Sequence, residues 1–163
     1  DAMLANGNGV SLRLATVFGV SPRMRTDLLV NDFVYKSIND GYLVLFEAHF
    51  KRNYIHVQDI ARTFQFIMEN YSSCKGQDFN VGLSRANLSK LELAEKIKTH
   101  IPNLVIKEDN FKEDFDKRNY IVSNDKLESL GWLPMFDLDY GIKQLISAYK
   151  LIINKNNQNF TNL

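Results

Sequence analysis

The sequence is poor in cysteine, in long apolar runs and in net charge. Its single cysteine, Cys74 in a polar stretch, cannot form an internal disulfide, so a reducing cytoplasm is the expected compartment. No stretch approaches the roughly 18 apolar residues of a membrane span, and the first residues lack the basic segment of a secretion signal. Twenty basic and nineteen acidic side chains give a net charge of +1. That balance argues against nucleic acid or an anionic membrane as a partner.

The sequence also lacks a glycine-rich turn for a dinucleotide. In the pattern G-x-G-x-x-G, the glycines let the backbone approach the pyrophosphate between a strand and a helix. Gly7 and Gly9 fill the first two places, but the third falls on Leu12, and both glycines precede a predicted strand. No group of His, Cys, Asp or Glu has the spacing of a metal site. We therefore expect neither a bound dinucleotide nor a metal in this chain alone.

Strand and helix signals alternate along the chain, which predicts an α/β fold. Residues 11–18 form a nearly continuous apolar run, typical of a parallel strand buried on both faces. Ser89 and Glu92 form an S-x-x-E capping box at a helix start. Further strands are expected at 42–46, 79–81 and 104–107, and helices at 27–39, 57–69, 89–101, 123–130 and from 138 onward. The polar tail 154–163 is expected to be disordered.

The most informative segment is 50–61, FKRNYIHVQDIA. From Val57 the apolar residues recur with the period of a helix, and Asp59 lies in the first turn, where a carboxylate is favourable. Arg52 precedes this helix on an extended approach. The segment resembles the R-x-[YF]-[IV]-H-V-x-D motif of the NAD-dependent epimerase/dehydratase family, extended short-chain dehydrogenases/reductases that act on nucleotide sugars.

Five further landmarks resemble this family and follow in its order. They are SLRLATVFG (11–19), SPRMRTDLLVN (21–31), LVLF (43–46), DFNVG (78–82), and Arg118 followed by LGWLP (130–134). The resemblance implies the carboxy-terminal part of a Rossmann-type extended enzyme, over residues 1–153. This part would comprise edge strands of the dinucleotide-binding sheet (11–18 and 78–82) and the small α/β substrate-binding domain.

The resemblance also implies site residues. Arg52 and Arg118 would clamp the nucleotide diphosphate, which suits the bidentate fork of a guanidinium; the alternative is two surface arginines in ion pairs. Phe46 would either lie against the nucleotide base or belong to the core. The remaining substrate-side candidates are Arg25, Asp27, Leu28 and Asn31, and the residues implied beside the nicotinamide are Thr16, Val17 and Phe18.

Three features have a simpler interpretation. Tyr71 and Lys75 have the spacing of the family's catalytic Tyr-x-x-x-Lys, but they follow the strand at 11–18 that the catalytic pair should precede. His56 and Asp59, beside a helix start, are interpreted as structural groups. Where many family members have a Gly-x-Gly turn, the chain has EAHF at 47–50. This departure concerns the loop over the diphosphate, so the sugar stays unassigned.

Two classes of function remain open. In the first, the chain is the nucleotide-sugar-binding half of an NAD-dependent (or NADP-dependent) epimerase/dehydratase, in which the cofactor oxidises the sugar at C4. An amino-terminal half, on a separate chain or removed from this one, would then supply the cofactor and the catalytic Tyr/Lys. In the second, the chain is a non-catalytic module that binds nucleotide sugars or a partner. Strands without their sheet neighbours expose edges, so a homo-oligomer is also expected.

Overall fold

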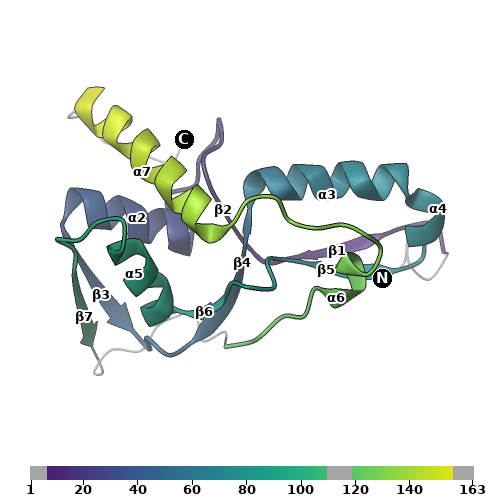
Figure 1. Cartoon of the computed structure of the whole chain (residues 1–163), viewed down its shortest axis with the longest axis horizontal. Coiled ribbons are helices and arrows are strands. Elements are labelled where there is room, and N and C mark those ends of the chain that lie inside the picture. Colours follow the sequence, from purple (N-terminus) through teal and green to yellow (C-terminus); the bar gives the residue numbers. More distant parts are fainter. Residues whose placement is uncertain (1–6, 110–118, 156–163) are drawn as a thin grey trace.

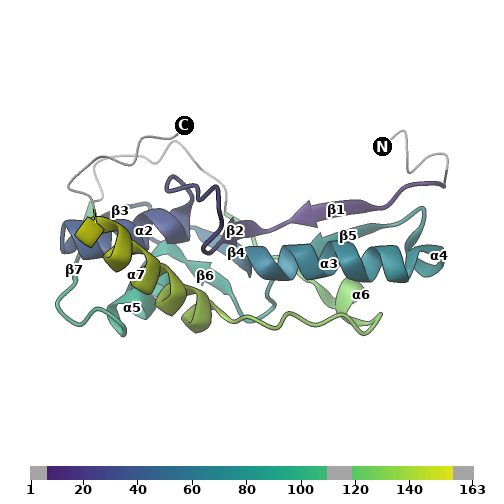
Figure 2. The same ribbon diagram turned by 90° about the horizontal axis from the view of Figure 1, so that it is seen from above.

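The computed structural model describes residues 7–109 and 119–155. The molecule is elongated, with two parts that differ in architecture (Figure 1). One part gathers several helices around short strands, and the other is a two-stranded ribbon accompanied by one long helix. Viewed from above, that helix runs along the ribbon for most of the ribbon's length (Figure 2).

The ribbon and a three-stranded sheet meet where the two parts join. β1 (Ser11–Leu14) pairs in parallel with β5 (Asp78–Val81) and forms the ribbon. β4 (Lys51–His56) is the central strand of the other sheet, with β2 (Thr16–Phe18) parallel on one side and β6 (Asn87–Ser89) antiparallel on the other. β4 therefore lies at the junction of the two parts, directly before the long helix.

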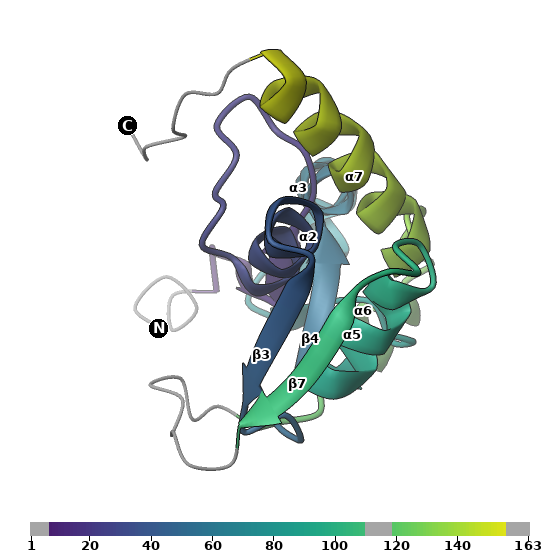
Figure 3. The ribbon, with the colours of Figure 1, turned by 90° about the vertical axis from the view of Figure 1, so that its left-hand side faces the viewer.

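A third sheet pairs β3 (Tyr42–Phe46) in parallel with β7 (Val105–Asp109). The end view shows these strands side by side, with α5 (Lys90–Lys98) on one flank (Figure 3). Next to them, α2 (Leu29–Asn39) packs against α7 (Leu138–Lys155). The larger hydrophobic core of the protein lies among these elements and includes Val30, Leu43, Leu93 and Ile142, each at most 2% exposed.

The long helix α3 (Val57–Glu69) covers one side of the ribbon and is followed directly by the short α4 (Tyr71–Cys74). α6 (Asp125–Glu128) contacts β5. A second, smaller core joins them and includes Phe79, Leu127 and Trp132. Among the described residues no helix is long and apolar enough to span a membrane.

The run at 11–18, predicted as one strand, is divided at Ala15. The amide of Ala15 still donates to Val81 O of β5 (2.9 Å), and from Thr16 onward the chain pairs with Tyr54 of β4. The prediction of burial on both faces is wrong for this strand, since Leu14 is 44% exposed. Phe79 of the neighbouring strand is only 1% exposed, because the second core encloses it.

Several local predictions are confirmed. The helix at 57–69 has the predicted bounds, and Ser89 and Glu92 form the reciprocal capping box. Gly41 follows the end of α2 with φ 75°, the left-handed conformation that glycine adopts without strain. The final helix reaches Lys155, two residues into the tail predicted from 154. The rest of that tail, 156–163, lies outside the described residues.

Other local predictions are wrong. Cys74 lies in α4 and is 0% exposed instead of in a polar loop. β4 and β6 were not predicted as strands. The short helix near 125 begins after Asn124 instead of Ser123, although the Ser123 hydroxyl accepts a hydrogen bond from the Asp125 amide (3.2 Å).

Candidate functional site

Arg52 lies at the start of β4 and is only 3% exposed. Its guanidinium is 5.7 Å from the centre of the Tyr120 ring, in cation–π contact, and Nη1 donates to Lys51 O at 3.3 Å. A guanidinium stays positively charged at any ordinary pH, so burial surrounds a permanent cation with protein. Since water competes less there, the attraction of this cation for an anion is stronger than at the surface.

The segment that contains Tyr120 runs beside β4 and is fixed to it by main-chain and amide groups. The Lys51 amide donates to Asn119 Oδ1 (2.9 Å), and the Tyr120 amide donates to Lys51 O (3.2 Å). Two residues on, Val122 bonds in both directions with the side chain of Asn87 on β6: its amide donates to Oδ1 (2.9 Å), and its carbonyl accepts from Nδ2 (3.0 Å). An asparagine side chain thus provides the pairing that a strand would normally provide.

Asn53 helps to fix the side chain of Asn87. It is fully buried on β4, and its Nδ2 donates to Leu83 O (2.9 Å) and to Asn87 Oδ1 (3.1 Å). Its Oδ1 accepts no hydrogen bond from the described residues and faces Gly82, where a Cβ would come within 1.8 Å of it. Close approach therefore explains the glycine of the DFNVG segment. Sequence reasoning missed Asn53 and Asn87, because each lies in a short segment of mixed polar composition, KRNYIH and NLS, that gives no strand signal.

The substrate-side candidates of the loop at 19–31 form one connected group. Asn31 is 2% exposed; its Oδ1 accepts from the Gly19 amide (3.0 Å), and its Nδ2 donates to Arg25 O (2.8 Å). The exposed side chains of Arg25 and Asp27 form a bidentate ion pair, whose hydrogen bonds hold the pKa of the Asp27 carboxyl below its usual value. Leu28 is the residue before the first turn of α2 and makes no side-chain cap. Asn31 thus shapes the loop, and substrate contact by these four residues stays a prediction.

The residues predicted beside the nicotinamide, Thr16, Val17 and Phe18, form β2. Phe18 is 1% exposed and packs edge-on against His56, with ring centres 5.4 Å apart. Its side chain therefore belongs to the core, and any contact with a cofactor would come from the main chain, as the sequence predicts. No interaction in the described residues tests that contact.

His56 agrees with its structural interpretation. Nδ1 accepts from the Gln58 amide (3.3 Å) at the start of α3, and Nε2 lies 3.0 Å from Gln144 Oε1 on α7. The ring is therefore neutral, with its proton on Nε2. Burial lowers the pKa of His56, while the Gln144 bond and the Asp59 charge partly oppose that shift. A Cβ on Gly19 would come within 2.6 Å of Nε2, so the ring fills the space that this glycine leaves.

Asp59 is structural, as predicted, but its hydrogen bonds extend beyond the first turn of its own helix. Oδ1 accepts from Arg62 Nη1 (2.6 Å) and from the Met135 amide (2.9 Å), and Oδ2 accepts from the Phe136 amide (3.0 Å). The carboxylate is 0% exposed. It fixes the segment that leads into α7 to the first turn of α3.

Phe46 ends β3 and is half-buried. Its carbonyl accepts from Lys90 Nζ (2.8 Å), and the same ammonium lies 5.6 Å from the ring centre of Phe50. Glu47 follows with φ 47°, the left-handed conformation that favours glycine. The turn at 47–50 thus adopts at Glu47 a conformation suited to the glycine that the resemblance predicts there.

Arg118, the second predicted diphosphate ligand, lies outside the described residues. Asn119 and Tyr120, which follow it, lie against the start of β4 beside Arg52. No interaction of the described residues joins Arg52 to Asp27 or Arg25, so their convergence on one ligand stays a prediction.

No group of three His, Cys, Asp or Glu side chains in 7–109 or 119–152 could hold a metal ion.

Tyr71 and Lys75 are placed at the far end of α3. The Tyr71 hydroxyl donates to Asn8 O (2.7 Å), and Lys75 lies just beyond the last residue of α4. The tyrosine is 43% exposed. The hydroxyl thus contacts the main chain that leads into β1, an arrangement suited to a structural group.

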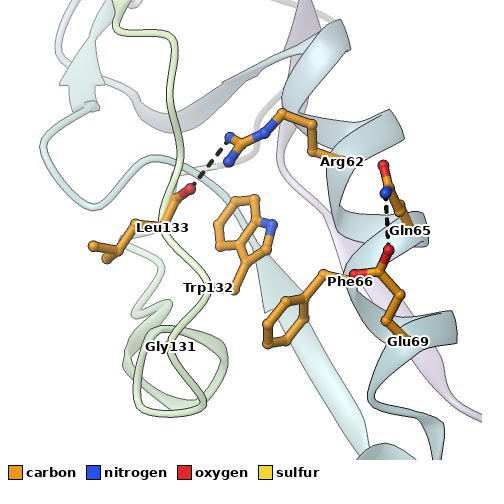
Figure 4. Close-up of a pocket in the computed structure, with 7 residues that line it drawn as sticks. All are labelled: Arg62, Gln65, Phe66, Glu69, Gly131, Trp132 and Leu133. Atoms are coloured by element: carbon orange, nitrogen blue, oxygen red, sulfur yellow. Dashed lines mark hydrogen bonds between the residues drawn. The ribbon is translucent and has the colours of Figure 1, made fainter.

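A pocket of about 240 Å³ lies between α3 and Gly131–Leu133 (Figure 4). Its polar groups bond to one another: Gln65 Nε2 donates to Glu69 (2.8 Å), and the guanidinium of Arg62 bonds to Asp59 and to Leu133 O. Trp132 Nε1 is buried and has no hydrogen-bond partner among the described residues. None of the site candidates that the structure describes lines this pocket.

Comparisons with known proteins agree with the fold. The model of the NAD dependent epimerase/dehydratase family matches residues 2–82. A dTDP-glucose 4,6-dehydratase from Bacillus anthracis in complex with NAD aligns over 92% of this chain and 49% of its own, with TM-score 0.73 and 18% identity. A UDP-glucuronic acid 4-epimerase from Bacillus cereus, in complex with UDP-glucuronic acid and NAD, aligns over 88% and 45%, with TM-score 0.73 and 20% identity. A putative GDP-L-fucose synthase of Arabidopsis thaliana is 35% identical over 101 residues, which are 60% of this chain and 29% of that protein.

The parallel strands and the helices that cover them define a Rossmann-type extended short-chain dehydrogenase/reductase fold. Within this class, the chain belongs to the NAD-dependent epimerase/dehydratase family. It spans about half the length of the similar solved structures and 29–38% of the curated relatives.

Proposed function

We propose that this chain binds the nucleoside-diphosphate sugar for an NAD-dependent epimerase/dehydratase, with Arg52 as a ligand of the diphosphate. A complementary dinucleotide-binding half, on the same polypeptide or on another, would supply the cofactor and the catalytic Tyr/Lys pair. The chain alone would then bind the sugar nucleotide without turning it over.

The observation that carries this proposal is the environment of Arg52. An arginine that is 3% exposed and stacked on Tyr120 has a restricted guanidinium orientation, and so loses little freedom when it binds. Two planar donors fit the oxygens of a diphosphate in a way that a flexible lysine would not. The similar B. cereus enzyme is in complex with a UDP sugar, which suggests the class of ligand to test.

A second observation supports a complementary half. Phe64, Met68 and Tyr71 follow one another at helical spacing on α3 and α4, and they are 50%, 70% and 43% exposed. Leu14 of β1 is 44% exposed, and β5 is the only sheet partner of β1 in the described residues. An apolar helix face together with a strand edge is the kind of surface that adding a strand and a helix would cover. Without that half, the same edge is expected to pair with a second copy of this chain.

The cofactor itself does not fit this chain alone. The candidate residues are Thr16–Phe18, whose last side chain is directed into the core, and the sequence has no pyrophosphate-binding turn. In the complete enzyme NAD or NADP would oxidise the sugar at C4. The contribution of this chain would be to bind the diphosphate and orient the sugar.

Calorimetric titration of the 163-residue chain with UDP-, dTDP- and GDP-glucose, and separately with NAD, tests the proposal. We expect one of the sugar nucleotides to bind and NAD to show no measurable heat. Binding of NAD at one equivalent, with no binding of any sugar nucleotide, would overturn this division of the two ligands.

A further inference from the structure

Beyond Arg52 itself, we infer that Asn87 is a positioning residue for the diphosphate site, acting on Arg52 through Tyr120. This inference rests on the proposed function and deepens it. The side chain of Asn87 bonds to Val122 and so fixes where the Tyr120 segment lies relative to the first residues of β4.

The amide of Asn87 is fully used. Its Nδ2 donates to Val122 O and to Ser84 O (3.4 Å), and its Oδ1 accepts from the Val122 amide and from Asn53 Nδ2. Asn53 is 0% exposed and is itself fixed by Leu83 O, so the Asn87 amide has a single orientation. Asn87 is partly buried, and breaking its hydrogen bonds to Val122 where water has limited access costs stability, so this pairing resists displacement.

Two residues before Val122, Tyr120 lies over the guanidinium of Arg52. In the register of β4 and β6, Asn87 is opposite Asn53, the residue next to Arg52. The Tyr120 ring is therefore placed by two attachments, at Lys51 on one side and at Asn87 on the other. Loss of the Asn87 attachment frees one side of the segment, and the ring no longer restricts the guanidinium.

Asn80 offers a matched control. Its Nδ2 donates from β5, a strand of the ribbon, to the carbonyl of Ser123 (3.0 Å), the residue after Val122. Asn80→Ala removes an amide contact to the same segment, but at its end away from Tyr120. A general loosening of the segment would affect both variants, whereas positioning of Tyr120 involves Asn87 alone.

The test measures the dissociation constant for UDP by calorimetry in a double-mutant cycle of Asn87→Ala and Arg52→Ala, with thermal unfolding as the control for folding. Asn87→Ala is expected to weaken UDP binding about tenfold, equivalent to about 1.4 kcal/mol, and Asn80→Ala less than about twofold. In the Arg52→Ala background, Asn87→Ala should cause no further loss, because groups that act through one another are not additive. If Asn87→Ala fails to fold, Tyr120→Leu replaces it in the cycle with the same expectations.

The outcomes separate the two proposals. If Arg52→Ala weakens binding and Asn87→Ala does not, or if Asn87→Ala causes the same loss in both backgrounds, the positioning role is wrong and the diphosphate site stands. If Arg52→Ala leaves UDP binding unchanged, or the parent chain binds no UDP, the proposed diphosphate site is wrong and the positioning role falls with it.

Discussion

Replacing Asp59 by asparagine should cost far more stability than its helix position alone suggests. The carboxylate is 0% exposed and accepts hydrogen bonds from one guanidinium and two main-chain amides, at 2.6–3.0 Å. An asparagine of the same shape keeps one acceptor oxygen and directs an NH₂ group at the other donor. The variant therefore loses one charge-assisted hydrogen bond, and its NH₂ group points at a second donor. Together these changes should lower the unfolding free energy by about 2–4 kcal/mol.

Asp32 is the matched control, since it also lies in the first turn of a helix, α2. It bonds to Lys36 one turn later, with side chains that are 27% and 50% exposed. A partly exposed pair of this spacing contributes about 0.3–0.5 kcal/mol, so Asp32→Asn should cost less than about 1 kcal/mol. Urea unfolding of both variants measures the difference. Equal losses would mean that the bonds from Asp59 to the Met135 and Phe136 amides contribute no stability.

Three further changes have defined outcomes. Burial lowers the pKa of folded His56, so the unfolded state binds more protons and the unfolding free energy should fall as the pH drops below about 6.5. Urea unfolding of His56→Gln should lack that fall, and a pH profile like that of the parent would exclude His56 as the cause of the fall. Gly82→Ala would place a Cβ within 1.8 Å of Asn53 Oδ1 and should lower the unfolding free energy by about 1–3 kcal/mol or more, whereas a thermal midpoint like that of the parent would contradict the close approach. Tyr71→Phe should leave the turnover of the complete enzyme within about threefold, because an acid–base group usually contributes about a hundredfold; a hundredfold loss with the fold intact would identify Tyr71 as catalytic.

The sequence predicts those features that local pattern determines. The bounds of α3 follow from the spacing of its apolar residues, and the capping box of α5 from Ser89 and Glu92 alone. The strand at 42–46 was likewise found from its composition. Each of these depends on neighbours within a few residues in the chain.

The features that the sequence did not predict depend on distant partners. β4 is buried along most of its length although it contains Arg52, Asn53 and His56, because other elements supply their hydrogen bonds and contacts. Its polar composition hid a central strand. The two roles that differ most from expectation, the bonds of Asp59 to residues 76 and 77 positions away and the support of the Tyr120 segment by Asn87, both require the folded chain.

The central claim is that Arg52 binds the diphosphate of a sugar nucleotide. The most direct measurement is a calorimetric titration of the parent chain, Arg52→Ala and Arg52→Lys with the nucleotide sugar that the parent binds most tightly. We predict that Arg52→Ala weakens binding by about 2–3 kcal/mol, roughly 30- to 160-fold, and that lysine recovers only part of this loss because a point charge cannot reproduce the planar fork. Equal affinity of the parent and a folded Arg52→Ala variant would contradict the claim and leave the likeness to the family as one of fold.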